Sequence, residues 1–191
     1  MLSLIHRDRR VAGRPAKASG PEAGAAPGNP CKVEGISEIR GYFSGTYVNG
    51  VDGKNRLSVP SSLRETVEVR SSVKALVLSP AEHAPCLVGY DVSYFARIEQ
   101  RLEQEFAQDF GPGRGNKARQ LFAMAEQLKY DDTGRIVLTP TLRDAGELGA
   151  TAVFLGAGDY FELWAPDLLL ARSDLDPRML RSVQSLLAGR N

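Results

Sequence analysis

The feature that most constrains this chain is a short turn-and-strand unit that occurs twice. The first copy is residues 52–60, Asp-Gly-Lys-Asn-Arg-Leu-Ser-Val-Pro, and the second is residues 131–140, Asp-Asp-Thr-Gly-Arg-Ile-Val-Leu-Thr-Pro. In both copies a further Arg follows eight residues after the first, at Arg64 and at Arg143. Two copies of one unit in a chain of 191 residues indicate an internally repeated fold.

Composition is ordinary for a soluble protein, with 42% hydrophobic and 25% charged residues. No apolar run approaches the length that crosses a membrane, so we expect no membrane partner. Two cysteines, Cys31 and Cys86, do not make a disulfide framework. These observations together predict a cytoplasmic protein.

The distribution of charge is more informative than the net charge of +1. Residues 1–41 hold seven Lys or Arg and four Asp or Glu, whereas residues 42–191 hold 17 and 19. Bulk charge therefore gives the folded part no attraction for nucleic acid. If it binds DNA, its cations must gather on one face or many copies must act together.

Pattern and composition divide the chain into five segments. Residues 1–41 are predicted to be a disordered tail with basic, Pro, Gly and Ala residues, because such a segment buries too little apolar surface to offset its ordering entropy. The alternatives are a basic arm that adds phosphate contacts, and a start codon assigned too far upstream. Beyond it we expect a first repeat in 42–92, a helical connection in 93–121, a second repeat in 122–168, and a C-terminal helix and tail in 169–191.

The first repeat is predicted to contain four strands and one short helix. Strands are expected at residues 42–43 continuing into 46–48, and at 57–59, 73–78 and 86–90, from their β-branched, aromatic and apolar content. Residues 49–55 are turn material, since Asn and Gly best tolerate positive φ. Pro60 ends the second strand, and Ser61 or Ser62 is expected to cap a helix that runs through Val67.

A helical hairpin is expected between the repeats. Apolar residues at spacings of three and four predict its first helix: Phe95, Ile98, Leu102 and Phe106. Residues 111–115 are expected to form the turn between the helices, and Asn116 to cap the second one.

The second repeat should follow the first, with one difference. Pro140 lies five residues after Arg135, whereas Pro60 lies four after Arg56, which predicts one extra residue in the second strand. A final helix is expected to begin at Pro177.

The chemistry of the repeated turn suits nucleic acid. A strand, turn and strand bring Asp52 close to Arg56, so that the carboxylate can hold the guanidinium in one orientation. A guanidinium held in this way is a rigid fork of donors, which matches phosphate oxygens or O6 and N7 of guanine. Lys54 and Asn55 add a cation and an amide to the same turn. The alternative is that Asp caps the turn and Arg merely pairs with it.

Four motifs then occur in order along the chain: Asp-x-Lys-x-Arg-Leu-Ser-Val-Pro-x-x-x-Arg, Cys-Leu-Val-Gly-Tyr, Asp-x-x-Gly-Arg-Ile-x-Leu and Phe-Glu-Leu-Trp. Taken together, over about residues 42–170, they resemble the MraZ family of bacterial transcriptional regulators. The resemblance implies an α+β fold of two tandem SpoVT–AbrB units. Their swapped β-hairpins would form one pseudo-dimeric barrel, with the helical hairpin between them and a C-terminal helix.

The resemblance also implies a function. Members of the family form homo-oligomeric rings, bind direct repeats in promoter DNA, and control the division and cell-wall gene cluster that includes their own gene. A protein of this kind is associated with the nucleoid and needs no cofactor, metal ion or small-molecule substrate. The resemblance makes the Asp-x-x-x-Arg turns the DNA-facing elements, and with the adjoining amide the candidate DNA-binding residues are Asp52, Lys54, Asn55, Arg56, Asp131 and Arg135.

The two turns differ from each other and from the family pattern. Asn55 stands where the family has Gly, and Asn is the best non-Gly residue for positive φ, so we expect the turn to survive. The second turn has Asp132 and no Lys, so it is less cationic. We therefore expect Lys54 and Arg56 to dominate DNA contact.

The sequence also bears on two other classes of function. An enzyme is not expected, because His83 and Cys86 alone make neither a metal site nor a catalytic triad, and residues 111–115 lack the ending of a phosphate loop. An oligomeric scaffold or protein-interaction module without DNA binding remains the alternative, because the apolar helical stripes would serve it equally well.

Overall fold

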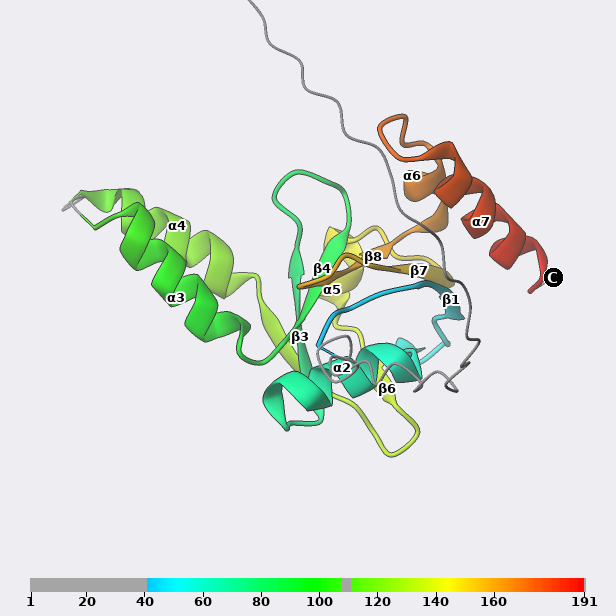
Figure 1. Ribbon diagram of the computed structural model, residues 1–191, viewed down its shortest axis with the longest axis horizontal. Coiled ribbons are helices and arrows are strands. Elements are labelled where there is room, and N and C mark those ends of the chain that lie inside the picture. The colour runs from blue at the N-terminus through cyan, green and yellow to red at the C-terminus, as the bar shows by residue number, and fades with distance from the viewer. Residues whose placement is uncertain (1–40, 108–110, 191) are drawn as a thin grey trace, which may run out of the picture. The chain divides into compact units, whose positions relative to one another are not determined.

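The computed structural model describes residues 41–107 and 111–190, so the predicted tail lies outside the described residues except for Gly41. The expected combination of helices with antiparallel strands is confirmed (Figure 1). The strands are β1 (Thr46–Gly50), β2 (Arg56–Ser58), β3 (Ala75–Pro80), β4 (Leu87–Asp91), β5 (Glu126–Lys129), β6 (Arg135–Val137), β7 (Thr151–Gly156) and β8 (Phe161–Trp164). The helices are α2 (Ser61–Ser71), α3 (Tyr94–Glu105), α4 (Pro112–Ala123), α5 (Pro140–Ala145), α6 (Pro166–Leu170) and α7 (Pro177–Ala188).

The order of elements repeats along the chain. β1, β2, α2, β3 and β4 follow one another in the first half, and β5, β6, α5, β7 and β8 follow in the same order in the second. The α3–α4 hairpin lies between these two runs, and α6 and α7 come after them. Sequence repetition is therefore matched by repetition of secondary structure.

Strand pairing joins the two halves rather than keeping them apart. The larger sheet has the order β1-β7-β8-β4-β3-β5. In β1–β7, Val48 lies opposite Val153, and in β5–β3, Leu128 lies opposite Leu76. The first strand of each run is thus paired with the third strand of the other. β1 and β5 remain at the edges of this sheet, so the described strands do not close into the expected barrel.

A second, two-stranded sheet pairs β2 with β6 and has the same exchange. Leu57 lies opposite Ile136. Beyond the ladder, the Val59 N–H donates to the Gly134 carbonyl over 2.9 Å, and the Leu138 N–H donates to the Asn55 carbonyl over 2.8 Å. These two bonds join equivalent positions of the two halves, so each turn is held by the strand that follows the other turn.

The main core is built from both halves of the chain. It contains buried side chains of β2, α2, β3 and β4 together with those of β6, α5, β7 and β8. The largest of its completely buried side chains include Phe43, Phe154, Phe161, Leu57 and Ile136. Burying one such side chain stabilises a fold by about 1.5–3 kcal/mol, so neither half would keep this core alone.

Helix α7 covers part of a second apolar cluster. Its Val183 is completely buried there, beside Val48 of β1 and Val153 of β7. The Asp176 carboxylate caps the helix by accepting the Arg178 N–H over 2.7 Å. The predicted start of this helix at Pro177 is confirmed.

The prediction of an extra residue in the second strand is wrong. β2 and β6 each contain three residues. Pro60 is the N-cap of α2, whereas Pro140 is the first residue of α5 and Thr139 is its N-cap. Both helices therefore begin at equivalent positions, and only the proline has moved by one, because its fixed φ suits both places.

The expected helix caps in the first half are also wrong. Ser61 is already the first residue of α2, and Pro60 offers no side-chain cap. Ser62 instead donates its hydroxyl to the Tyr47 hydroxyl over 2.7 Å. Its side chain therefore joins α2 to β1.

The helical hairpin differs from its prediction at one end. α4 begins at Pro112, with Gly111 as its N-cap, so residues 112–115 are helical instead of forming a turn. Asn116 lies inside the helix, where its side chain accepts from Arg119 over 2.5 Å. A proline at the first helical position has a pre-organised φ, and this preference for a helix start outweighs the tendency of the following glycines to form a turn.

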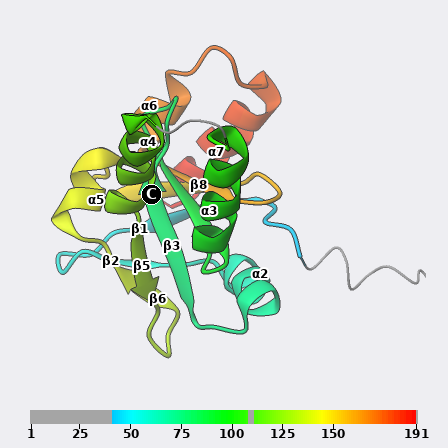
Figure 2. The same ribbon diagram turned by 90° about the vertical axis from the view of Figure 1, so that its left-hand side faces the viewer.

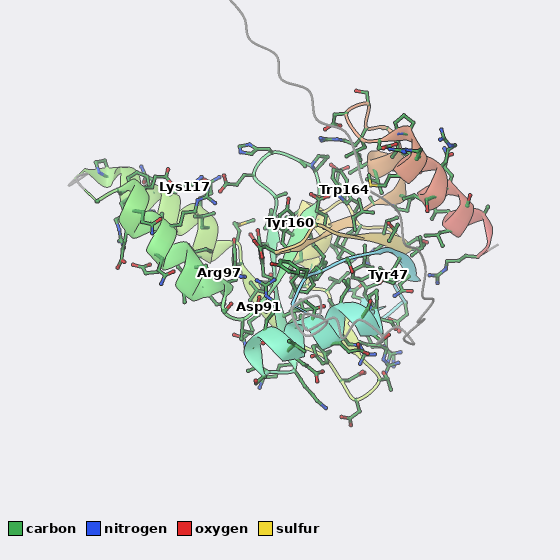
Figure 3. The ribbon with its side chains drawn as sticks, in the orientation of Figure 1. Tyr47, Asp91, Arg97, Lys117, Tyr160 and Trp164 are labelled. Atoms are coloured by element: carbon green, nitrogen blue, oxygen red, sulfur yellow. The ribbon has the colours of Figure 1, made fainter. Side chains whose placement is uncertain are left out.

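A buried carboxylate ties this hairpin to the rest of the fold. Asp91 at the end of β4 has no exposed side-chain surface and lies 2.9 Å from Arg70 Nε of α2 and 3.2 Å from Arg97 Nη2 of α3. Its Oδ1 also accepts the Ser93 N–H over 3.0 Å. Figure 3 shows Asp91 and Arg97 side by side where α3 meets the sheet.

Candidate nucleic-acid interface

The first turn is organised around one carboxylate. Asp52 Oδ1 accepts the backbone N–H groups of Lys54 and Arg56 over 2.8 and 2.9 Å. Its other oxygen, Oδ2, accepts Arg56 Nε over 2.7 Å. The Asp52 N–H in turn donates to the Arg56 carbonyl over 3.0 Å, which closes the turn. One side chain therefore fixes both the backbone and the direction of the guanidinium.

This arrangement leaves the functional end of Arg56 available. Its terminal nitrogens have no hydrogen-bond partner in the part of the chain that the structure describes, and its side chain is 35% exposed. Lys54 is exposed and makes no ion pair among the described residues. The predicted positive φ of Asn55 is confirmed at 60°. A guanidinium and an ammonium thus stand together at the tip of one turn.

The carboxylate is firmly ionised. The hydrogen bond from the Arg56 backbone N–H acts most strongly, and with those from the Arg56 side chain and the Lys54 N–H it lowers the pKa of Asp52 to about 2. Asp52 is therefore a permanent anion at neutral pH. Because Asp52 holds Arg56 through Nε, the protein itself sets the orientation of that guanidinium.

The second turn repeats each of these bonds and adds two, from the Thr133 hydroxyl and from Arg135 Nη2. Asp131 Oδ1 accepts the N–H groups of Thr133 and Arg135 over 2.9 and 3.0 Å, and Oδ2 accepts Arg135 Nε over 2.9 Å. The Thr133 hydroxyl adds a bond of 2.6 Å. This hydroxyl, followed by the Arg135 backbone N–H, lowers the pKa of Asp131. Gly134 takes the place of Asn55, with φ of 77°.

Both turns protrude beyond the strands that they join, the first in cyan and the second in yellow-green in Figure 2. The pairing of β2 with β6 brings them into one structural unit. Candidate residues that lie 79 positions apart in sequence are therefore held in fixed relation. All of the predicted site residues thus lie in two matching turns, one at each end of this small sheet.

Arg143, the second Arg of the later repeat, reaches into the first turn. Its Nη1 donates to Asn55 Oδ1 over 2.6 Å, while Nε and Nη2 donate to the Leu148 carbonyl over 3.2 and 3.0 Å. Nη2 is also 3.4 Å from the Gly149 carbonyl. All three guanidinium nitrogens therefore have protein partners, and the Asn55 amide is anchored.

Arg64, the second Arg of the earlier repeat, lies against the second turn. Its Nε donates to the Val59 carbonyl over 3.1 Å. A methyl group placed on Gly134 would come within 2.5 Å of this Nε, so the guanidinium covers the glycine. Gly134 is accordingly buried although it lies in an exposed turn. Positive φ and this close approach both require glycine at the position.

A cation from the end of the chain stands beside the first turn. Arg190, just beyond α7, donates through Nη1 to the Val48 carbonyl and lies 3.4 Å from Asn49 Oδ1. Asn49 in turn donates to the Ser58 carbonyl over 2.7 Å. Asn49, Ser58 and Arg190 line a hollow of about 280 Å³ together with Gly50, Val51 and Asp52.

Sequence reasoning placed the turns but not these three arginines in the site. The spacing of eight residues between the two arginines of each copy was the available signal for Arg64 and Arg143. It could not say that each reaches the turn of the other half. Nothing in the sequence signalled Arg190, because its position depends on how α7 packs on β1.

Other parts of the chain offer less to a ligand. Cys86 is buried in the second apolar cluster, and burial followed by the charge of Glu162 raises the pKa of its thiol to about 12. No group of three or more His, Cys, Asp or Glu in residues 41–107 and 111–190 is placed to hold a metal ion. Among the helices of that part of the chain, none combines the length and apolarity of a membrane span.

A larger hollow of about 480 Å³ lies between the β3–β4 loop, α3 and the start of β8. Tyr90, Tyr94, Tyr160, Arg97, Arg101 and Glu162 are among its lining residues. Tyr90 and Tyr94 stack with ring centroids 3.9 Å apart, and Arg97 already forms an ion pair with Asp91. Its charges are mixed, so it favours no one class of ligand.

Comparison with known proteins gives a consistent result. Residues 121–168 match the family described as "MraZ protein, putative antitoxin-like". The chain is 30% identical to the transcriptional regulator MraZ of Rhodospirillum rubrum over 136 residues, which are 71% of this chain and 87% of that protein. It is 32% identical to the transcriptional regulator MraZ of Gluconacetobacter diazotrophicus over 126 residues, 65% of this chain and 78% of that protein. A third relative of the same name, from Coxiella burnetii, is 32% identical over 122 residues, 64% of this chain and 78% of that protein.

Proposed function

Because this chain belongs to the MraZ family, we propose that it is a transcriptional regulator that binds DNA through its two Asp-x-x-x-Arg turns. The relatives that it matches are named transcriptional regulators. The observation that carries the proposal is the shared pair of hydrogen bonds, from the backbone N–H and from Nε, with which Asp52 and Asp131 hold Arg56 and Arg135. Two pre-oriented guanidiniums on one unit are suited to phosphates and to guanine edges.

The first turn is the stronger candidate for base contact. Arg56 keeps its terminal nitrogens available, whereas Arg135 Nη2 lies 2.8 Å from Asp131 Oδ2. Lys54 adds an ammonium that the second turn lacks. Asn55 is held by Arg143, so its amide belongs to the support of the turn more than to its reading edge.

The arrangement of the chain that we propose is an interleaved pseudo-dimer. The first repeat comprises residues 42–92 and the second residues 122–168, with the helical connection 93–121 between them and 169–191 as a C-terminal segment. The exchanged pairs β1–β7 and β5–β3 support this arrangement, as do the paired bonds across β2 and β6. Residues 1–41 remain a candidate basic arm.

We further propose that the chain acts as a ring of identical subunits on direct repeats in promoter DNA. The charge of the folded part supports this, because residues 42–191 carry 17 basic and 19 acidic side chains and one subunit offers few phosphate contacts. Several subunits on repeated sites gain affinity through effective concentration. The proposed target is the division and cell-wall gene cluster that includes its own gene, which would place the protein on the nucleoid in the cytoplasm.

Binding of the full chain to a labelled duplex from its own upstream region tests the function. Arg56→Ala should weaken binding about tenfold or more, and Arg135→Ala should weaken it less, because a bidentate contact contributes about 1–3 kcal/mol. Arg178→Ala is the matched control, since Arg178 also pairs with an aspartate, Asp176, but lies on α7. Affinity should fall steeply as salt rises.

Two outcomes would contradict the proposal in different ways. If Arg135→Ala weakens binding and Arg56→Ala does not, the first turn is not the dominant reader. If the wild-type chain shows no binding at low salt while remaining oligomeric, the protein is an oligomeric scaffold. Analytical ultracentrifugation of the same sample separates loss of assembly from loss of contact.

A further inference from the structure

The two arginines that follow the turns are not equivalent, although they occupy equivalent sequence positions. Arg143 has protein partners for Nε, Nη1 and Nη2. Arg64 donates only from Nε, to the Val59 carbonyl, and its terminal nitrogens have no hydrogen-bond partner within the described part of the chain. Neither forms an ion pair with a carboxylate there. Arg64 therefore has terminal N–H donors available to a ligand, whereas those of Arg143 already donate to protein oxygens.

The position of Arg64 places its terminal N–H donors beside the second turn. Its guanidinium lies on Gly134, the residue that immediately precedes Arg135. Because Gly134 has no side chain, nothing from the turn stands between this guanidinium and the backbone that carries Arg135. Arg64 is partly exposed, so the charge reaches solvent beside the second turn.

Arg64 also changes the charge at the second turn. The first turn carries Lys54 and Arg56 from its own sequence, whereas the second carries Arg135 and an additional acid, Asp132. Arg64 supplies a second cation to that turn from the other half of the chain. The second turn therefore has two basic side chains when the fold is taken into account, although its own sequence supplies only one.

We propose that Arg64 is a DNA-contacting residue, which binds a backbone phosphate beside the one that Arg135 reaches. This inference rests on the proposed function, since it assigns a further residue to the same DNA interface. A guanidinium with free terminal nitrogens suits phosphate oxygens, and two neighbouring guanidiniums suit successive phosphates of one strand. Arg143, by contrast, is a positioning residue, which acts on DNA only through Asn55.

The test is the salt dependence of DNA binding by the full chain. Each phosphate contact contributes a slope of about −0.9 to the plot of log affinity against log salt concentration. Arg64→Gln should reduce the magnitude of that slope by about one for each subunit engaged on the duplex and should weaken binding about threefold to tenfold at physiological salt. Arg64→Lys should restore the slope, because it restores the charge.

Two control variants separate contact from structure. Arg143→Gln should weaken binding with little change of slope, because its guanidinium is already occupied by protein acceptors. Arg178→Gln should change neither quantity. Thermal unfolding of Arg64→Gln is measured in parallel, since the variant also loses the bond to the Val59 carbonyl.

The outcomes are distinct. A wild-type slope for Arg64→Gln overturns the inference, whether or not affinity falls, because a purely structural Arg64 would not move the slope. Failure of Arg64→Lys to restore it overturns the inference as well. In both cases binding by the wild-type chain leaves the proposed function intact, whereas failure of the wild-type chain to bind overturns the proposed function itself.

Discussion

Arg143 Nη1 donates to Asn55 Oδ1 over 2.6 Å across a sequence separation of 88 residues. This bond means that the conformation of the first turn depends on a helix of the second half, α5, which carries Arg143. Arg64 makes the reciprocal approach, from α2 to Gly134 of the second turn. The two repeats are therefore not structurally independent, because each supports the turn of the other.

Asn55 is expected to tolerate glycine better than alanine. Asn55→Gly keeps access to positive φ and loses only the bond from Arg143, so the free energy of unfolding should fall by about 1 kcal/mol or less. Asn55→Ala also forces alanine to φ of 60° and should cost about 1–2 kcal/mol more. Urea unfolding at fixed protein concentration measures both. Equal losses for the two variants would show that the turn does not need the positive φ.

Gly134 and Gly53 occupy the two turns but should respond in opposite ways to alanine. Gly134→Ala meets a positive φ of 77° and the Arg64 guanidinium, so it should destabilise the chain by about 1–3 kcal/mol and weaken DNA binding. Gly53→Ala meets no atom within 4 Å and should change stability by less than about 0.5 kcal/mol. Urea unfolding and fluorescence anisotropy with a labelled duplex provide the two readouts. If Gly134→Ala changed neither stability nor DNA binding, the Arg64 guanidinium would be able to move away from the turn at little cost.

Asp91 is expected to be one of the most sensitive polar positions outside the turns. Burial alone would raise its pKa, but the hydrogen bonds from Ser93 and the charges of Arg97 and Arg70 lower it, so the group is ionised in the folded protein. Asp91→Ala leaves two guanidiniums without their buried partner and should lower the free energy of unfolding by about 3–5 kcal/mol.

Asp159→Ala is the matched control for Asp91→Ala. Asp159 approaches the same Arg70, at 3.6 Å, but its side chain is 78% exposed. Exposed pairs contribute less than about 1 kcal/mol, so this variant should unfold near the wild-type urea concentration. Comparable losses in the two variants would contradict the role given to burial.

DNA affinity should be insensitive to pH between about 6 and 8 as far as the turns are concerned. The pKa of Asp52 lies at about 2, below its ordinary value of 3.8, and that of Asp131 is lowered as well. A carboxyl group whose pKa is lowered by folding stabilises the fold at pH values above its ordinary pKa. That stabilisation is lost as the pH falls through the pKa of the folded state. The turns should thus lose their order only between about pH 4 and 2.

Anisotropy titrations at constant ionic strength, followed by circular dichroism down to acid pH, measure this dependence. Asp52→Asn removes one of the two carboxyls and should shift the acid transition without introducing a step near neutrality. A titration midpoint between pH 6 and 8 that Asp52→Asn abolishes would contradict the assignment of Asp52 as a permanent anion.

Much of the local structure could be predicted from the sequence because local physics decides it. The turn at Asp52 follows from Asn and Gly, which accept positive φ, and from an aspartate that can accept backbone N–H groups two and four residues ahead. Helix α7 follows from Asp176 and Pro177 at its start. The errors fell where two local signals competed, as at Pro112, where a good first helical residue precedes two glycines, and at Pro60 and Pro140, which fit neighbouring positions of one helix start equally well.

By itself the sequence determined that two Asp-x-x-x-Arg turns exist, how each is folded, and which residues stand at their tips. Only the tertiary structure decided which half supports which turn. Exchange of β1 and β5 between the halves, and pairing of β2 with β6, carry Arg143 to Asn55 and Arg64 to Gly134. The physical reason is that the main core contains side chains of both halves and is buried only when the halves interleave. The residue pattern within one repeat does not show which strand of the other repeat it will pair with.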